Sequence, residues 1–138
     1  YPKIPLNLDE ALEAGSTGLH VVLGGLHPGH STNAVAALIS ERIHAHMFVN
    51  ATDVDGVYSA DPAKDSSARL MTSISIKEVG EFIKNGQMQA GTYKLMDMTA
   101  LKIIERSKIP TRVVRCAVSP INAALNGENV GTLIEVDE

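Results

Sequence analysis

The sequence predicts an α/β protein, a three-layer α/β/α sandwich around a mostly parallel sheet. Short apolar runs with strand character alternate with stretches of helical periodicity, and loops rich in glycine or aspartate follow the apolar runs. The length of 138 residues suits a single domain. Hydrophobic residues make up 44% of the chain and charged residues 20%, which excludes a disordered tail and a coiled coil.

The first two elements are a helix and a strand. We expect the helix over 7–15, because Asn7 can cap it, Glu10 stands three residues later and Gly15 suits the C′ position. The apolar run 19–23 is closed by two glycines and predicts a strand buried on both faces.

A second helix and strand follow. The polar residues 31–33 offer caps for a helix whose apolar residues recur at helical spacing as far as Ile43. The run 47–49 predicts the parallel neighbour of strand 19–23, so that the two form a right-handed βαβ unit. Residues 52–70 contain too many Asp, Gly, Pro and Ser for a core element; they predict an extended loop, with or without a short hairpin.

The rest of the chain continues the alternation. Ser75 and Glu78 form a capping box, with Ile74 and Val79 as a hydrophobic staple, and begin a helix that we expect to end near Asn85-Gly86. The later elements expected are an irregular stretch 87–93, a helix capped by Asp97, a strand 111–116, a short helix 120–126 and a strand 131–136.

Charge and cysteine content exclude several classes of function. The formal net charge of −4 argues against a nucleic-acid partner, and no apolar run approaches the ~20 residues that a membrane helix needs. Cys116 is the one cysteine, which excludes an internal disulfide and fits a reducing compartment. Its place in a strand pattern predicts a small core residue rather than a nucleophile.

The first candidate site is the loop 24–32 between strand 19–23 and the next helix. Its spacing approaches the phosphate-binding pattern G-x-x-x-x-G-K-[ST], but His30 stands where the lysine must be, so a true P-loop is excluded. Glycines and the N–H groups at a helix start can still hold an anion. From its own chemistry the loop is either such a site or a turn with a Ser/Thr cap.

The second candidate site is the loop 52–62 after strand 47–49. Asp53, Asp55 and Asp61 can approach a magnesium nucleotide, or they can order the loop through Asx-type turns. Two histidine pairs could be considered as metal ligands, His27 with His30 and His44 with His46. Neither pair has a further Cys or His at a supporting spacing, so the sequence does not predict a metal site.

The two loops together resemble the amino acid kinase superfamily and, within it, the archaeal uridylate kinases. The resemblance rests on Gly24 to Ala37, on Thr52 to Tyr58 and on Asp61-Pro62, and it extends along the whole chain. The Thr52 to Pro62 pattern is shared across the superfamily, whereas the GG-x-x-PGH-S-T loop points to the uridylate kinases. The later segments that agree are Gln89 to Tyr93, Asp97, Lys102 to Ile109, Gly127-Glu128 and Gly131 to Ile134.

The resemblance implies an enzyme that transfers the γ-phosphoryl group of ATP to UMP, with Mg²⁺, in pyrimidine nucleotide biosynthesis. It also implies a cytoplasmic homohexamer, and it makes residues 1–138 the C-terminal, nucleotide-binding portion of one amino acid kinase-like domain. By carry-over, Asn33 would orient catalytic groups. The UMP-binding residues would be Leu26, His27, Pro28, Gly29, His30, Ser31 and Thr32, and the ATP site would be lined by Thr52, Asp53, Tyr58 and Asp61.

The chain departs from the family pattern in three ways. Asn33 stands where many members carry Asp, and Asp53 stands where archaeal members often carry Asn. The chain begins with Tyr1 and lacks the N-terminal portion that holds the family's main catalytic lysine, so we expect the 138 residues alone to be inactive. Alternatives are an isopentenyl phosphate kinase-like enzyme and a non-catalytic nucleotide-binding or storage protein on the same fold.

Overall fold

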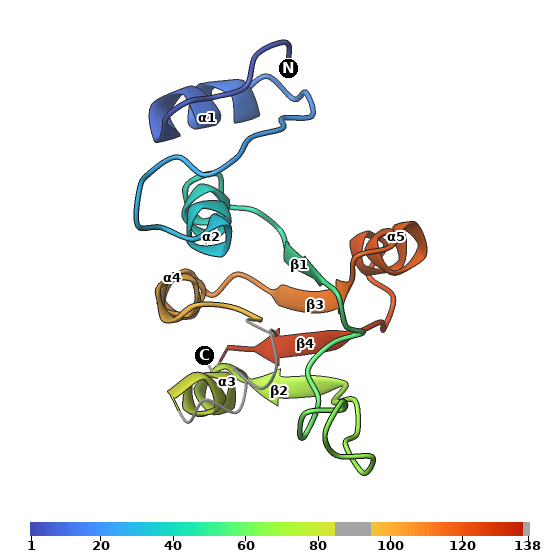
Figure 1. The fold of residues 1–138 in the computed structure, drawn as a ribbon. Helices are drawn as coiled ribbons and strands as arrows, with labels where there is room; N and C mark the ends of the chain where they lie inside the picture. Colours follow the sequence, from blue (N-terminus) through green and yellow to red (C-terminus); the bar gives the residue numbers. More distant parts are fainter. Residues whose placement is uncertain (85–94, 137–138) are drawn as a thin grey trace.

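A four-stranded sheet is the centre of the fold and positions both candidate loops. A computed structural model describes residues 1–84 and 95–136, and its four strands lie in the order β1 (Phe48–Thr52), β3 (Thr111–Arg115), β4 (Thr132–Glu135) and β2 (Ser73–Ser75) (Figure 1). The β1/β3 and β2/β4 pairs are parallel, and the central β3/β4 pair is antiparallel. The expectation of a mostly parallel sheet is therefore confirmed, with an antiparallel pair at its centre.

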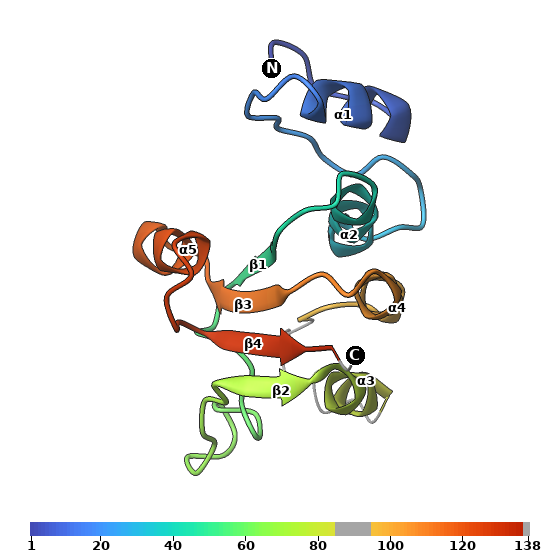
Figure 2. The same ribbon diagram turned by 180° about the vertical axis from the view of Figure 1, so that it is seen from behind.

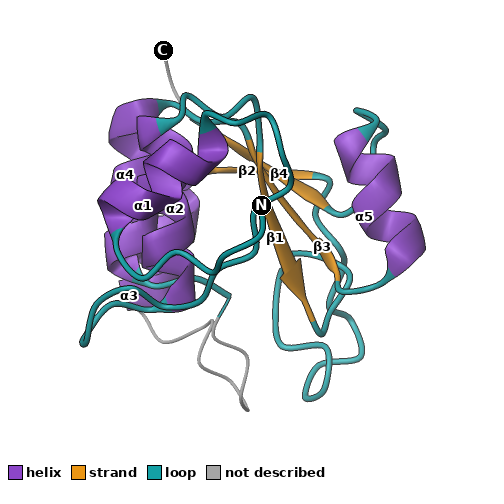
Figure 3. Cartoon of the chain, turned by 90° about the horizontal axis from the view of Figure 1, so that it is seen from above, coloured by secondary structure: helices purple, strands orange, loops and turns teal. Residues whose placement is uncertain are grey.

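Helices cover both faces of this sheet, as a three-layer sandwich requires. The helices α2 (Thr32–Arg42), α3 (Ile76–Lys84) and α4 (Met98–Ser107) lie on one face, and α5 (Val118–Leu125) lies on the other (Figure 3). The helix α1 (Leu8–Gly15) packs against α2 on the side away from α4, as the view from behind also shows (Figure 2). The predicted α/β/α architecture is confirmed.

The main core lies between the sheet and the α2, α3 and α4 layer. Side chains of alternate strand residues point toward these helices, because successive residues of a strand face opposite sides. The strands contribute Phe48, Val113 and Ile134, and the helices pack small and branched side chains against them: Ala34, Ala37, Val79, Ala100, Leu101 and Ile104.

The expected helix caps are present. Asn7 Oδ1 accepts from Glu10 N at 2.9 Å, and Ser75 Oγ and Glu78 form the predicted box, with Glu78 N 3.2 Å from Ser75 Oγ and Ser75 N 3.0 Å from Glu78 Oε2. Asp97 Oδ1 caps α4 through Ala100 N at 3.0 Å. These caps use neighbours in sequence only, so local pattern was sufficient to predict them. Gly15, expected at C′, is instead the last residue of α1.

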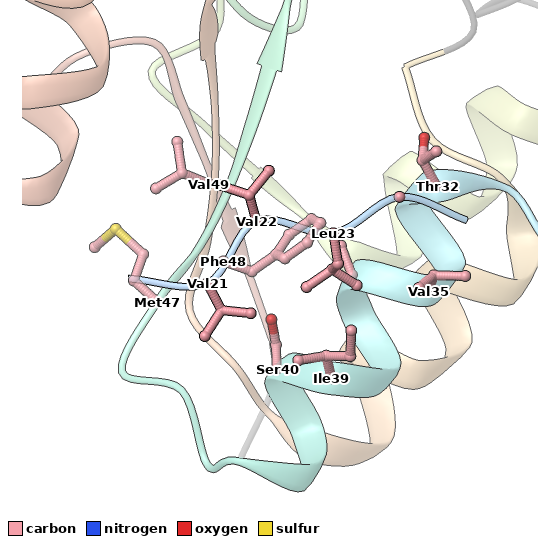
Figure 4. A pocket seen from close by; sticks show the side chains of 12 residues that line it. Val21, Val22, Leu23, Thr32, Val35, Ile39, Ser40, Met47, Phe48 and Val49 are labelled. Carbon is pink, nitrogen blue, oxygen red and sulfur yellow. The ribbon is translucent and has the colours of Figure 1, made fainter. Parts of the chain in front are cut away.

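The predicted strand 19–23 is absent, and this is the main correction. Residues 19–24 have no regular structure, and Val22 is 76% exposed. Val21 to Gly24 and Met47 to Val49 line a cavity of about 550 Å³ together with residues of α2 (Figure 4). A strand needs backbone partners, and among the described residues no strand lies on the far side of this segment, so its apolar run lacks the second neighbour that a fully buried strand requires.

Other differences are smaller. The strand after α2 runs to Thr52 rather than Val49, and β2 was not predicted. The hairpin in loop 52–70 is confirmed by the antiparallel bridge between Tyr58 and Leu70. Cys116 follows β3 and is exposed, so its assignment to the core was wrong. The expectations for 87–93 and for a helix end at Asn85-Gly86 lie outside the described residues, as does the segment Gln89 to Tyr93.

Candidate functional site

Both candidate loops lie at the same edge of the sheet. The loop 26–32 leads into α2, which runs back past the sheet, and β1 then returns and ends at Thr52, where the second loop begins. Figure 3 shows the two loops at the edge toward which β1 points. In α/β sheets ligands bind at the carboxyl ends of the strands. The loop 52–61 follows β1 directly, whereas the loop 26–32 follows an irregular segment and leads into α2.

The loop 26–32 is an exposed turn in front of α2. His30 N donates to His27 O at 3.3 Å, and Gly29 adopts φ +84°, a conformation that other residues rarely take. The side chains from His27 to Thr32 are exposed, whereas Leu26 is half-buried. The rings of His27 and His30 meet edge to face with their centroids 6.0 Å apart. The backbone is therefore accessible to a ligand from solvent.

Ser31 connects this loop to the start of α4. Its hydroxyl caps α2 by accepting from Ala34 N at 3.0 Å, and it donates a short hydrogen bond to Asp97 Oδ2. Partial burial raises the pKa of the Asp97 carboxyl, but the hydrogen bonds from Ser31 and from backbone N–H groups outweigh this and hold the pKa below its ordinary value. One serine and one aspartate thus cap two helices and join them.

The Asp97 charge predicts a pH-dependent stability. Because its pKa is lowered by folding, the carboxylate stabilises the fold above the ordinary aspartate pKa, and this contribution is lost as the pH falls through the folded-state pKa. Asp97→Asn keeps a capping side chain and removes the charge. We expect a loss of less than about 1 kcal/mol at pH 7, after allowance for solvent screening, that diminishes progressively as the pH falls below about 4.

Urea midpoints of the wild type and the variant at pH 7, 5 and 3 measure this difference. Asp9→Asn, a change of the same chemistry in the first turn of α1, is the control for general charge effects. A difference between wild type and Asp97→Asn that stays constant with pH would contradict the assigned role of the Asp97 charge.

Asn33 and Asn50 bind the same backbone oxygen. Asn33 Nδ2 donates to Leu95 O at 3.3 Å, and Asn50 Nδ2 donates to the same carbonyl oxygen at 2.6 Å. Asn50 is buried in β1, and Leu95 lies two residues before the Asp97 cap. The two amides therefore join the first turn of α2, the middle of β1 and the approach to α4 at one oxygen atom.

The loop 52–61 begins with a tight turn and continues into the hairpin. Thr52 Oγ1 donates to Val54 O at 3.0 Å, and Val57 N donates to Thr132 Oγ1 at 2.8 Å. Gly56 passes close to β4, because a Cβ atom there would lie 2.5 Å from Thr132 Oγ1. Backbone contacts with β4 and its own turn thus set the path of this loop.

Asp55 connects the polar side chains of this loop. Arg115 donates to Asp55 Oδ1 from Nε at 2.6 Å and to Asp53 O from Nη1 at 3.0 Å. Tyr58 Oη donates to Asp55 Oδ2 at 3.2 Å. Hydrogen bonding from the Arg115 guanidinium holds the pKa of Asp55 below its usual range, and burial with the Asp55 contact raises the pKa of Tyr58.

Asp61 differs from the other predicted ATP-site residues. Its Oδ1 accepts from Ala63 N at 2.9 Å, and Lys64 Nζ lies 3.6 Å from its Oδ2, so the Asx-type turn that the sequence left open is what Asp61 forms. The structure thus joins Asp53 and Tyr58 through Asp55 and Arg115, whereas the contacts of Asp61 are with its own turn.

Sequence reasoning missed Asn50 and Arg115 as candidate site residues. The signal for Asn50 was an amide within the apolar run Met47 to Ala51, because a buried polar group needs a hydrogen-bond partner. Arg115 gave a weaker signal, a charged residue at the end of an apolar strand. Its partners lie 60 and 62 residues away in sequence, and only the fold reveals them.

The described residues form neither a metal-binding cluster nor a membrane-spanning helix. No group of three or more His, Cys, Asp or Glu side chains within 1–84 and 95–136 could hold a metal ion. In the same ranges no helix has the length and hydropathy to cross a membrane.

The chain is similar in sequence to archaeal uridylate kinases. The chain is 44% identical over 135 residues to uridylate kinase of Methanobrevibacter smithii and 46% identical over 132 residues to that of Archaeoglobus fulgidus. These alignments cover 97% and 96% of the chain, and the chain spans 60% of the length of each relative.

Solved structures give the same result. The crystal structure of uridylate kinase from Archaeoglobus fulgidus superimposes with a TM-score of 0.85 at 45% identity, over 97% of this chain and 60% of that one. UMP kinase from Bacillus anthracis shares the fold, with a TM-score of 0.76 at 22% identity, over 97% of this chain and 53% of that one. The sequence profile of the amino acid kinase family matches residues 4–115. The chain therefore belongs to the amino acid kinase family.

Proposed function

We propose that this protein transfers the γ-phosphoryl group of ATP to UMP, giving UDP and ADP. The observation that carries the proposal is the 44–46% identity to two archaeal uridylate kinases, which spans both candidate loops. The geometry supports it, because the loops lie at one end of β1 and the elements next to them, α2 and β1, are joined through the Leu95 carbonyl. Phosphoryl transfer depends on positioning and charge neutralisation, which such an arrangement of loops can provide.

In this proposal the two loops take different substrates. The loop 26–32 binds UMP, with the N–H groups at the start of α2 near its phosphate. The loop 52–61 binds ATP, with Thr52, Asp53 and Tyr58 nearest to it. Asn33 acts by holding the 95–97 segment against α2, the contact that its amide makes in the structure.

Mg²⁺ enters the proposal together with ATP. Magnesium usually keeps several waters and binds through substrate phosphates plus one or two carboxylates, so it does not need a cage of protein ligands. The carboxylates present fit this mode, since Asp53 is exposed in the ATP loop while Asp55 is held by Arg115. Asp53 is the side chain that would approach the ion, which would neutralise phosphate charge.

The proposal is tested by assaying the product of the intact gene with MgATP and three acceptors: UMP, CMP and isopentenyl phosphate. We expect UDP as the dominant product, and no UDP from the 138-residue chain alone. Turnover with isopentenyl phosphate only would contradict the assignment of the 26–32 loop. A folded protein that binds ATP without any turnover would support a binding or storage role instead, and its metal content would then be measured.

A matched glycine pair tests the acceptor loop in the same assay. Gly29 and Gly127 have φ +84° and +78°, and a Cβ at either would meet nothing within 4 Å. Both alanine variants therefore carry similar backbone strain. We expect only Gly29→Ala to raise the KM for UMP, because Gly127 lies in the turn after α5.

We also propose, from the family resemblance, a cytoplasmic homohexamer that serves pyrimidine nucleotide synthesis. Light scattering of the intact gene product measures the mass of the assembly. A monomer or dimer at working concentration would contradict the hexamer and leave the assignment of the reaction untouched.

A further inference from the structure

Arg115 stands where the ATP loop leaves the sheet. It is the last residue of β3 and pairs in register with Thr52, the last residue of β1. Cys116 N donates to Thr52 O at 2.6 Å, so the two strands remain joined at their ends. The Arg115 side chain is therefore anchored on the rigid sheet, directly beside the loop that begins at residue 53.

One guanidinium fixes three positions of that loop. Its Nε donates to the Asp55 carboxylate at 2.6 Å, and its Nη1 donates to the Asp53 backbone carbonyl at 3.0 Å. The second oxygen of Asp55 accepts from Tyr58 Oη at 3.2 Å. Arg115 thus holds both the backbone at the start of the loop and, through Asp55, the tyrosine at its far end.

These contacts are poorly suited to a purely stabilising role. The side chains of Arg115 and Asp55 are each 49% exposed, and exposed ion pairs add little to stability. They are well suited to fixing a binding loop, because a loop ordered before the ligand arrives loses less entropy on binding.

We propose that Arg115 is a positioning residue for the nucleoside triphosphate site, and that it acts by holding residues 53–58 in the conformation that binds ATP. The inference rests on the proposed function for the identity of the ligand. Arg115 acts through Asp55 and the Asp53 carbonyl, and contact with ATP is not part of the proposal.

The first test is the kinetics of Arg115→Ala in the intact gene product. We expect the KM for MgATP to rise roughly three- to tenfold, the effect of losing two partly exposed charge-assisted hydrogen bonds, while the KM for UMP stays within about twofold. Arg106→Ala is the matched control. Arg106 makes a bidentate pair with Glu41, 2.7 Å for each bond, near the ends of α4 and α2 at the opposite edge of the sheet.

Two further variants separate positioning from charge alone. Arg115→Lys keeps the charge, but an ammonium group cannot direct two planar donors to Asp55 and to the Asp53 carbonyl at once. It should therefore show most of the rise in KM for MgATP that Arg115→Ala shows. In the double variant Arg115→Ala/Asp55→Asn the KM should stay raised. If adding Asp55→Asn to Arg115→Ala restores the wild-type KM for MgATP, Arg115 acts by charge and the positioning role is rejected. The same conclusion follows if Arg115→Lys has the wild-type KM for MgATP.

The remaining outcomes are also decisive. Equal changes of Arg115→Ala in the KM for MgATP and the KM for UMP, with a lowered melting temperature, would indicate a structural role and overturn the inference. A KM for MgATP of Arg115→Ala that equals that of Arg106→Ala would also overturn it. If the wild type does not phosphorylate UMP, calorimetric MgATP dissociation constants replace KM, so that the proposed function fails while the inference is still tested. A wild type that binds no MgATP would reject both.

Discussion

Gly131→Ala is expected to lower the free energy of unfolding by about 3 kcal/mol or more. Gly131 adopts φ +63° immediately before β4, and a Cβ atom there would lie 2.0 Å from Val113 O and 2.9 Å from Val114 Cγ1. Val113 is in the middle of β3, so the backbone cannot move aside without breaking the antiparallel β3/β4 pair. Urea denaturation followed by far-ultraviolet circular dichroism measures the loss.

Gly127→Ala separates the clash from the cost of the backbone conformation. Gly127 has φ +78° but no heavy atom within 4 Å of its virtual Cβ, so its alanine variant should lose only about 1 kcal/mol. Equal losses for the two variants would show that the close approach of Gly131 to β3 does not govern stability.

Asn50→Leu is expected to affect both stability and activity. Leucine has a similar size but cannot donate to Leu95 O, which then loses its shorter hydrogen bond and, of the two amide contacts, keeps the longer one from Asn33. The expected loss of stability is about 1–3 kcal/mol, the cost of a buried polar group left without its partner. Because Leu95 precedes the Asp97 cap that holds Ser31, we also expect kcat/KM for UMP to fall roughly ten- to a hundredfold.

Asn122→Leu is the control for this substitution. Asn122 lies exposed on α5, so the same change of side chain there removes no buried hydrogen bond. An Asn50→Leu variant that unfolds at the wild-type midpoint would contradict the role of the buried amide. A kcat/KM for UMP no lower than that of Asn122→Leu would contradict the coupling between the Leu95 carbonyl and the acceptor loop.

The fold class could be predicted because its signals are local. Capping pairs such as Ser75 and Glu78 lie three residues apart, and the apolar runs at Phe48 and Val113 mark strands that are paired and buried in the structure. The failure at 19–23 has the opposite cause. An apolar run favours burial, but a strand forms only where neighbouring backbones supply hydrogen bonds. The sequence of the run does not indicate which neighbouring strands are present.

The candidate site divides in the same way. The loops 26–32 and 52–61 could be identified from residue types and order, and the assignment of their ligands rested on resemblance. The partners of Ser31 and Asp55 could not be identified, because Asp97 and Arg115 lie 66 and 60 residues away from them in the chain. Such contacts depend on which strands and helices become neighbours.

The sequence by itself determined the α/β class, most of the elements, their caps and the two glycine- and aspartate-containing loops, since each depends on residues within one turn or one strand. The tertiary structure decided the antiparallel pair at the centre of the sheet and the absence of the 19–23 strand. It also decided that Asn33 and Asn50 donate to the same carbonyl oxygen, that of Leu95, and that Arg115 donates hydrogen bonds to Asp53 and Asp55. These features depend on which backbone edges and side chains meet after the chain has folded, and no local pattern encodes that meeting.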